Sequence, residues 1–204
     1  MNPSLLLAAL AALAPAPAAA PGGWLAAPDV QQRLAAGEVV VQTAQDIDEA
    51  HPRGRLRAAV RIEAPAEAIW KVMTDCRQAP AYVPGLKRCR VINGAADGRW
   101  EDIEQEVRYS WFLPTVRYVF RAEYDPPYRI DFRRVSGDLK EEEGTWRLIE
   151  APDRSATVVE YDMYIDPGFW IPQALVVRSL RRDLPAALTG LRTRVLELAV
   201  AASH

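Results

Sequence analysis

The sequence predicts an α+β fold in which an antiparallel sheet packs against one long C-terminal helix. Three observations lead to this prediction. Between Ile62 and Leu86, a strand gives way to a short helical segment and then to a turn rich in aromatic residues and proline. About eighty residues of strand pattern follow, divided by turn residues. From Pro172 onward the apolar residues recur at helical spacing.

The first twenty residues have the pattern of a secretory signal peptide. They contain no charged side chain, and an apolar segment from Leu5 to Leu13 precedes small residues near Ala16 to Ala20. The apolar segment is too short for a stable membrane-spanning helix. We therefore expect residues 1–20 to be a signal peptide and the protein to be exported, with a periplasmic location. Cleavage after Ala18 and an uncleaved membrane tether are the alternatives.

Residues 21–37 are predicted to be an N-terminal extension, and residues 38–201 the main domain. The extension contains a short helix from Pro28 to Ala36, because Asp29 lies near its start and Gly37 is a stop signal. In the main domain, alternating apolar and polar residues between turn residues predict strands. These strands are 38–44, 55–62, 89–92, 101–111, 116–124, 128–135, 145–150 and 157–165.

The helical segment after the second strand begins near Pro65. Proline suits the first helical turn because it has no amide proton to leave unpaired. Ile69, Trp70 and Val72 then form an apolar face at helical spacing. Asp75 ends the helix, and the residues that follow turn the chain into the next strand.

The alternation along each strand predicts which side chains face inward. The apolar inward residues are Leu56, Ala58, Val60, Ile62, Ile103, Val107, Trp111, Val116, Phe120, Ile130, Phe132, Trp146, Leu148, Val159, Met163 and Ile165. Gln105 and five tyrosines share this face: Tyr109, Tyr118, Tyr124, Tyr128 and Tyr161. Because a buried hydroxyl needs a partner, so many tyrosines favour a cavity with scattered polar groups over a solid core. Glu160 and Asp162 lie on the opposite face, and we interpret them as surface charges.

The C-terminal helix is predicted to form the second wall. Its apolar stripe consists of Leu175, Val176, Leu180, Leu184, Leu188, Leu191, Val195 and Leu198. Pro185 lies inside this helix and is expected to kink it, since proline removes a hydrogen bond and contacts the preceding turn. A kinked helix over a concave sheet leaves space for a ligand.

Cys76 and Cys89 flank the end of the helical segment and the start of the next strand. In an oxidising compartment a single pair of cysteines is a candidate disulfide, which would clamp the helical segment to the sheet. Two small buried thiols are the alternative, and the sequence leaves both open.

The entrance to the cavity is predicted from the turns. Alternate turns of an antiparallel meander lie at the same end of the sheet, so residues 111–114, 136–143 and 166–172 should lie together. Two of these turns are apolar and contain the predicted entrance residues Phe112, Leu113, Phe169 and Trp170. Exposed apolar loops indicate contact with a ligand, a partner or a membrane. Loops that simply pack on each other are the alternative.

Composition and motifs exclude several function classes. The net charge of −2 gives no support for nucleic-acid binding. The chain has no nucleophile elbow and no phosphate-binding glycine loop, and its two histidines are His51 and the terminal His204. We therefore expect no metal and no cofactor, and we identify no catalytic residue.

Several moderate motifs together carry a resemblance to a known family. They are the segment APAEAIWKVMTD at 64–75, Tyr82–Leu86, Gly137–Lys140, Gly144-Thr145-Trp146, Asp166-Pro167 and Pro172. In these motifs the chain resembles the START-like (SRPBCC, helix-grip) superfamily, in its coenzyme-Q-binding and polyketide-cyclase-like branch. The resemblance implies a curved antiparallel sheet of about seven strands wrapped around the C-terminal helix, with a short helix pair after the first strand. It also implies binding of lipids, quinones or other lipophiles.

We expect a monomeric carrier that holds a hydrophobic small molecule between the sheet and the terminal helix, with transient membrane contact through the apolar loops. The predicted ligand-binding residues are Trp70, Gln105, Tyr109, Trp111, Tyr118, Phe120, Phe132, Trp146, Tyr161, Met163, Val176, Leu180 and Leu184. Two alternatives stay open. One is a cyclase- or aromatase-like enzyme acting on a polyketide-type substrate. The other is an interaction module of the cell envelope, which would have a collapsed core.

Overall fold

The computed structural model describes residues 23–43, 54–108, 115–166 and 173–202, with the backbone alone for 43, 173–181 and 202. Its centre is an antiparallel sheet of eight strands in the order β1-β2-β8-β7-β6-β5-β4-β3. The strands are β1 Val40–Thr43, β2 Gly54–Ile62, β3 Leu86–Gly94, β4 Trp100–Val107, β5 Val116–Asp125, β6 Arg129–Gly137, β7 Glu141–Glu150 and β8 Thr157–Asp166. The helices are η1 Gly23–Ala26, α1 Pro28–Ala35, α2 Ala66–Met73, α3 Ala79–Tyr82 and α4 Gln173–Ala202.

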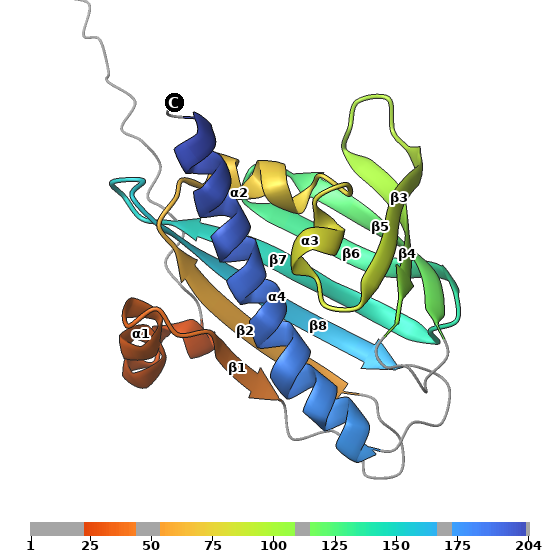
Figure 1. Cartoon of the computed structure of the whole chain (residues 1–204), viewed down its shortest axis with the longest axis horizontal. Coiled ribbons are helices and arrows are strands. Elements are labelled where there is room, and N and C mark those ends of the chain that lie inside the picture. Colours follow the sequence, from red (N-terminus) through yellow and green to blue (C-terminus); the bar gives the residue numbers. More distant parts are fainter. Residues whose placement is uncertain (1–22, 44–53, 109–114, 167–172, 203–204) are drawn as a thin grey trace, which may run out of the picture.

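The predicted helix-grip architecture is confirmed. Strands β3 to β8 form a meander, β2 pairs with β8, and α4 crosses one face of the sheet (Figure 1). The sheet has eight strands, as the alternation pattern predicted, whereas the resemblance implied about seven. The short β1, inside the predicted strand 38–44, pairs with β2 as an additional edge strand. None of the described helices is long and apolar enough to cross a membrane.

A packed core fills the part of the interface where β2, β7 and β8 face α2 and α4. Its members are fully or almost fully buried: Ala58, Val60, Ile62, Ala64, Ala66, Ile69, Val72, Leu148, Val159, Leu188, Leu191 and Val195. The period of two along β2 and the helical spacing along α4 place these residues on facing surfaces. Toward β3, β4 and β5 the same interface widens into the cavity described below.

Helix α4 approaches α3 closely at one glycine. A Cβ atom at Gly190 would lie 3.0 Å from both the Cβ and the carbonyl oxygen of Tyr82. Gly190 therefore lets the short helix α3 pack directly on α4. Helix α4 continues through Pro185. The cavity-lining residues Asp183, Leu184 and Ala187 lie on either side of that proline in the sequence.

The N-terminal extension covers the outer face of the sheet. Leu25, Val30 and Leu34 pack against Val40 and Ala59 on the side of the sheet opposite α4. The helix predicted at Pro28 to Ala36 is therefore present as α1, and its apolar side is buried against the outer face of β1 and β2.

Glu160 and Asp162 are buried, so the interpretation of both as surface charges was wrong. They do lie on the outer face, but they are only 4% and 7% exposed. Glu160 accepts a hydrogen bond from Trp24 Nε1 at 2.7 Å and one from Arg147 at 2.9 Å. Asp162 forms ion pairs with two arginines of β2. Alternation gave the correct face, but the extension and the arginine side chains cover it.

Two further expectations need correction. Tyr128 is 47% exposed and does not face the cavity, because it precedes β6 at the turn after Pro126-Pro127. Strand β7 begins at Glu141, four residues before the predicted start at Thr145. Its pairing with the end of β8, from Glu141↔Asp166 onward, extends the strand into a run of three glutamates.

Candidate functional site

The principal feature of the inner face is a cavity of about 270 Å³ between the sheet and the helices. Its walls come from the segment 73–84, from strands β2 to β8, and from the middle of α4. This volume lies just below the range of roughly 300–1,000 Å³ that is typical of small-molecule pockets. The cavity thus suits one compact organic molecule.

One wall of the cavity is a continuous row of aromatic rings that crosses four strands. The Tyr118 and Phe120 ring centroids are 6.2 Å apart, and Phe120 meets Phe132 edge-on at 6.2 Å. Phe132 stacks on Tyr161 at 5.8 Å, and Tyr161 stacks on Trp146 at 4.0 Å. Flat apolar faces in this arrangement favour a ligand that itself contains a ring.

Gly144 makes room for this row. It lies on the inner face of β7, opposite Phe132 on β6. A Cβ atom at this position would lie 2.5 Å from Cζ of Phe132 and would also overlap the Asp162 carbonyl oxygen. A side chain at 144 would therefore displace the Phe132 ring from the wall.

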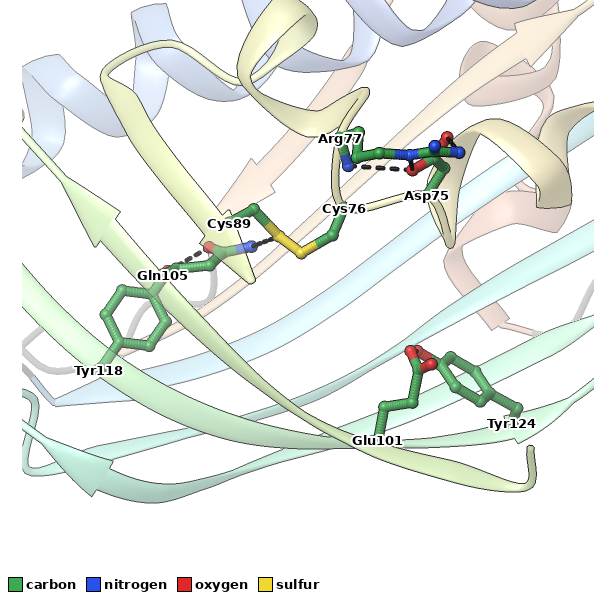
Figure 2. The surroundings of a disulfide bond; sticks show 8 residues. All are labelled: Asp75, Cys76, Arg77, Cys89, Glu101, Gln105, Tyr118 and Tyr124. Carbon is green, nitrogen blue, oxygen red and sulfur yellow. Dashed lines mark hydrogen bonds and ion pairs between the residues drawn. A yellow bond between two sulfur atoms is a disulfide. The ribbon is translucent and has the colours of Figure 1, made fainter. Parts of the chain in front are cut away.

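Three tyrosine hydroxyls at the wall have hydrogen-bonding partners. The Tyr118 hydroxyl donates to Oε1 of Gln105 at 2.8 Å, and the Tyr161 hydroxyl donates to Sδ of Met163 at 2.7 Å. The Tyr124 hydroxyl donates to Glu101 at 2.8 Å (Figure 2). These contacts satisfy the buried phenols, as the sequence argument required.

A disulfide between Cys76 and Cys89 forms part of the cavity wall. Their Cα atoms are 5.3 Å apart, and both residues line the cavity. Figure 2 shows the bond joining the segment after α2 to β3, with Gln105 reaching from β4 toward the Cys89 sulfur at 4.0 Å. Of the two states that the sequence left open, the structure has the bonded one.

Two carboxyl groups also line the cavity, Glu142 from β7 and Asp183 from α4. Asp183 forms an ion pair with the neighbouring Arg182 at 2.7 Å. Glu142 is 8% exposed, and its Oε2 atom has no hydrogen-bond partner within the described part of the chain. A buried polar atom without a hydrogen-bond partner destabilises the fold, because it has lost its hydrogen bonds to water and gained none in return.

Burial changes the acidity of several of these groups. Desolvation raises the pKa of Glu142 from its ordinary value of 4.5 to about 8. Desolvation, reinforced by the hydrogen bond to Glu101, raises the pKa of Tyr124 well above 10, and burial does the same for Tyr82. At neutral pH the described groups around the cavity thus include a carboxyl that is largely protonated.

The structure brings most of the predicted ligand-binding residues together at this cavity. Those that line it are Gln105, Tyr118, Phe120, Phe132, Trp146, Tyr161, Met163 and Leu184. Trp70 does not, because its ring packs edge-on against Tyr124 at 5.8 Å and joins the packed core. Tyr109 and Trp111 lie outside the described residues, and so do the side chains of Val176 and Leu180.

The entrance residues Phe112, Leu113, Phe169 and Trp170 also lie outside the described residues. The elements that flank them do meet at one end of the sheet. Val107 pairs with Val116 there, and the amide of Asp138 donates to the Arg117 carbonyl at 2.8 Å. At the same end, the Lys140 amide donates to the Asp166 carbonyl at 3.0 Å. The argument from alternate turns thus holds for the described flanking residues.

The sequence analysis missed part of the site. Tyr82, Val83, Pro84 and the disulfide form a wall from the helix pair, and Glu142 and Asp183 add carboxyl groups. The proline-rich segment after Asp75 could have indicated the wall formed by Tyr82, Val83 and Pro84. This segment must cross the open face of the sheet to reach the next strand. Glu142 gave no such signal, because a run of three glutamates resembles a charged turn.

Comparison with known families gives a match that covers most of the domain. Residues 62–192 match the family described as polyketide cyclase / dehydrase and lipid transport. The chain belongs to this family. The match extends from the end of β2 through α4 and includes the helix pair and the cavity-lining strands. A search of curated proteins found no match.

Solved structures show the same fold in members of the START superfamily and in aromatase/cyclases. The STAR-related lipid transfer protein from Xanthomonas axonopodis is 19% identical, with a TM-score of 0.64 over 77% of this chain and 93% of that one. The Zhui aromatase/cyclase from a Streptomyces species is 16% identical, with a TM-score of 0.62 over 74% and 98%. The lipid transfer domain of human StarD13 is 13% identical, with a TM-score of 0.61 over 76% and 83%. The START-like assignment from the sequence is thereby confirmed.

Proposed function

We propose that this protein is an exported carrier that binds a hydrophobic small molecule, such as a lipid or a quinone, between the sheet and α4. The observation that carries this proposal is the cavity of about 270 Å³ with its row of aromatic rings. Transfer of apolar ligand surface from water into such a cavity is worth about 25 cal/mol per Å². This gain offsets the entropy lost when the ligand is immobilised.

Export is part of the proposal and is supported by two features. Residues 1–20 have the apolar segment and small residues of a signal peptide. The Cys76–Cys89 disulfide suits an oxidising compartment such as the periplasm. We propose that the mature carrier acts there as a monomer and contacts membranes transiently through the apolar turns predicted at 111–114 and 166–172.

The carrier function is tested by asking what the protein holds after purification. Native mass spectrometry should detect a bound species that denaturation releases, and extraction should identify it as a lipophile. Adding the extracted molecule back should raise the melting temperature, as expected for a ligand that binds the native state alone. An empty protein that no lipophile stabilises would refute the carrier function.

A second prediction concerns the entrance. Replacing Phe112 and Trp170 together by serine should slow ligand loading or weaken binding to vesicles. Thermal stability should change little, because exposed loop substitutions usually cost less than about 0.5 kcal/mol. Loading is measured as uptake of the extracted lipophile from vesicles. A large loss of stability would mean that these rings belong to the core and do not form an entrance.

A cyclase- or aromatase-like activity is the second candidate, and one observation favours it. Glu142, Asp183 and several tyrosines line the same cavity, so it contains groups able to move protons. Similarity in fold to an aromatase/cyclase is consistent with this candidate. It predicts turnover of a polyketide-type substrate that is lost in Tyr118→Phe. The third candidate, an interaction module, predicted a collapsed core, and the cavity argues against it.

A further inference from the structure

Among the described residues that line the cavity, Glu142 has a buried carboxyl oxygen, Oε2, without a hydrogen-bond partner. It is the second residue of β7 and lies on the inner face, as do Trp146 and Leu148 of the same strand. The side chain is 8% exposed and lines the cavity, and Oε2 has no hydrogen-bond partner within the described residues.

The immediate surroundings of Glu142 are apolar. Ile165 is its partner on β8, and the next inward pair along the two strands is Gly144 and Met163. Phe132 lies opposite Gly144 on β6. All four apolar neighbours on this patch, Leu56, Phe132, Met163 and Ile165, line the same cavity.

The charged groups described near this end of the sheet have other partners, except that the buried Nε atom of Arg134 on β6 has none. Lys140 forms an ion pair with Asp166 at 3.1 Å, and Nη2 of Arg134 donates to the Gly137 carbonyl at 3.0 Å. Asp183, across the cavity on α4, is paired with Arg182. Desolvation by burial raises the pKa of Glu142 to about 8.

We propose that Glu142 is the polar anchor of the cavity and that the ligand is a neutral, ring-containing lipophile with a carbonyl or hydroxyl oxygen. The carboxyl group donates its proton in a hydrogen bond to that oxygen, while the ring lies against Phe132 and Tyr161. This inference rests on the proposed ligand-binding function and specifies its ligand class.

A neutral ligand fits the site better than a cationic one. A cation would require Glu142 to be ionised among apolar side chains, where the free protein holds it protonated. A neutral oxygen instead satisfies the buried carboxyl without creating a charge. This hydrogen bond gives the site specificity. A ligand with an oxygen pairs with the Glu142 carboxyl, whereas a hydrocarbon of the same shape leaves that carboxyl without a partner.

The test uses two probes of nearly the same shape, 2-acetylnaphthalene and 2-isopropenylnaphthalene, which differ in that a CH2 group replaces the carbonyl oxygen. Dissociation constants are measured by calorimetry at about pH 6.5 and about pH 9.5, on either side of the Glu142 pKa. At the lower pH the wild-type protein should bind the ketone roughly three- to tenfold more tightly than the hydrocarbon. At the higher pH this preference should disappear, because an ionised carboxylate has no proton to donate.

Variants assign the effect to one side chain. Glu142→Gln keeps a neutral donor, so it should retain the preference for the ketone at both pH values. Glu142→Leu should lose the preference and still bind the hydrocarbon. Glu143→Gln, on the exposed neighbour, should behave as the wild type. Within the part of the chain that the structure describes, the other ionisable residues lining the cavity are Tyr82 on α3, Tyr118 and Tyr124 on β5, Tyr161 on β8 and Asp183 on α4.

Four results would overturn the proposal. Equal binding of both probes by the wild-type protein at both pH values would show that Glu142 anchors nothing. If the pH dependence of the preference for the ketone is lost in Asp183→Asn and kept in Glu142→Gln, then Asp183 and not Glu142 controls it. Tighter binding of naphthylmethylammonium than of the ketone, lost in Glu142→Gln, would identify a cation site. If neither naphthalene binds the wild-type protein, the anchor fails together with the proposed lipophile binding.

Discussion

At about pH 9, the Glu142→Gln variant is expected to be several kcal/mol more stable than the wild-type protein, whereas at about pH 4 the two should be nearly equal. The native protein holds the Glu142 proton up to a pKa of about 8, and the unfolded chain releases it near 4.5. Between these values the native state binds more protons, so its stability falls as the pH rises. Each tenfold difference in proton affinity corresponds to about 1.4 kcal/mol.

The free energy of unfolding from urea titrations at several pH values measures this effect. Relative to the Glu142→Gln variant, the free energy of unfolding of the wild-type protein should fall between about pH 4.5 and about pH 8. Above about pH 8 the difference between the two proteins should stay constant. Glu143→Gln serves as the matched control, because this exposed neighbour should change stability by less than about 0.5 kcal/mol. A constant difference between Glu142→Gln and wild type at all pH values would mean that packing, and not ionisation, explains the change.

Loss of the Cys76–Cys89 disulfide should have the second large effect. The bond closes a loop with a sequence separation of 13, for which the entropy of the unfolded chain predicts about 3 kcal/mol of stabilisation. Strand β3 is the edge of the sheet and is exposed over most of its length. The disulfide is thus the covalent link that holds β3 to the segment after α2 and keeps this wall of the cavity in place.

A double variant, Cys76→Ser with Cys89→Ser, measures this contribution. It is compared with the wild-type protein in thermal unfolding with and without reductant. The melting temperature should fall by roughly 6–12 °C in the variant, and the affinity for the bound lipophile should fall with it. Reductant should destabilise the wild-type protein and leave the variant unchanged. Equal stability of the variant and the oxidised wild-type protein would show that the clamp contributes nothing.

The inner face of the sheet could be predicted because its pattern is strong. Along β2, β5 and β8 apolar residues recur at every second position, and many of the residues between them are arginine, glutamate or aspartate. The period of two therefore places Tyr118, Phe120 and Tyr161 correctly. The turns and the long apolar stripe of α4 were equally clear. These features depend on residues close in sequence, which is what pattern analysis detects.

The missed features depend on contacts between distant segments. Glu142 faces the cavity because β7 pairs with β8 beyond the region where its own residues favour a strand. Glu160 is buried because Trp24, from the N-terminal extension, reaches its carboxylate. Trp70 lies on the apolar face of its helix, but its ring packs against Tyr124 and the core and does not line the cavity. Alternation specifies a face, and it does not specify what covers that face.

The central claim is that the cavity between the sheet and α4 holds a lipophile. The most direct measurement is a crystal structure of the protein with the molecule extracted from it added back. The proposed function predicts electron density for the ligand inside the cavity, with a ring against Phe132 and Tyr161 and an oxygen within hydrogen-bonding distance of Glu142. Density for the ligand on the outer surface, together with a cavity filled by water, would contradict the claim.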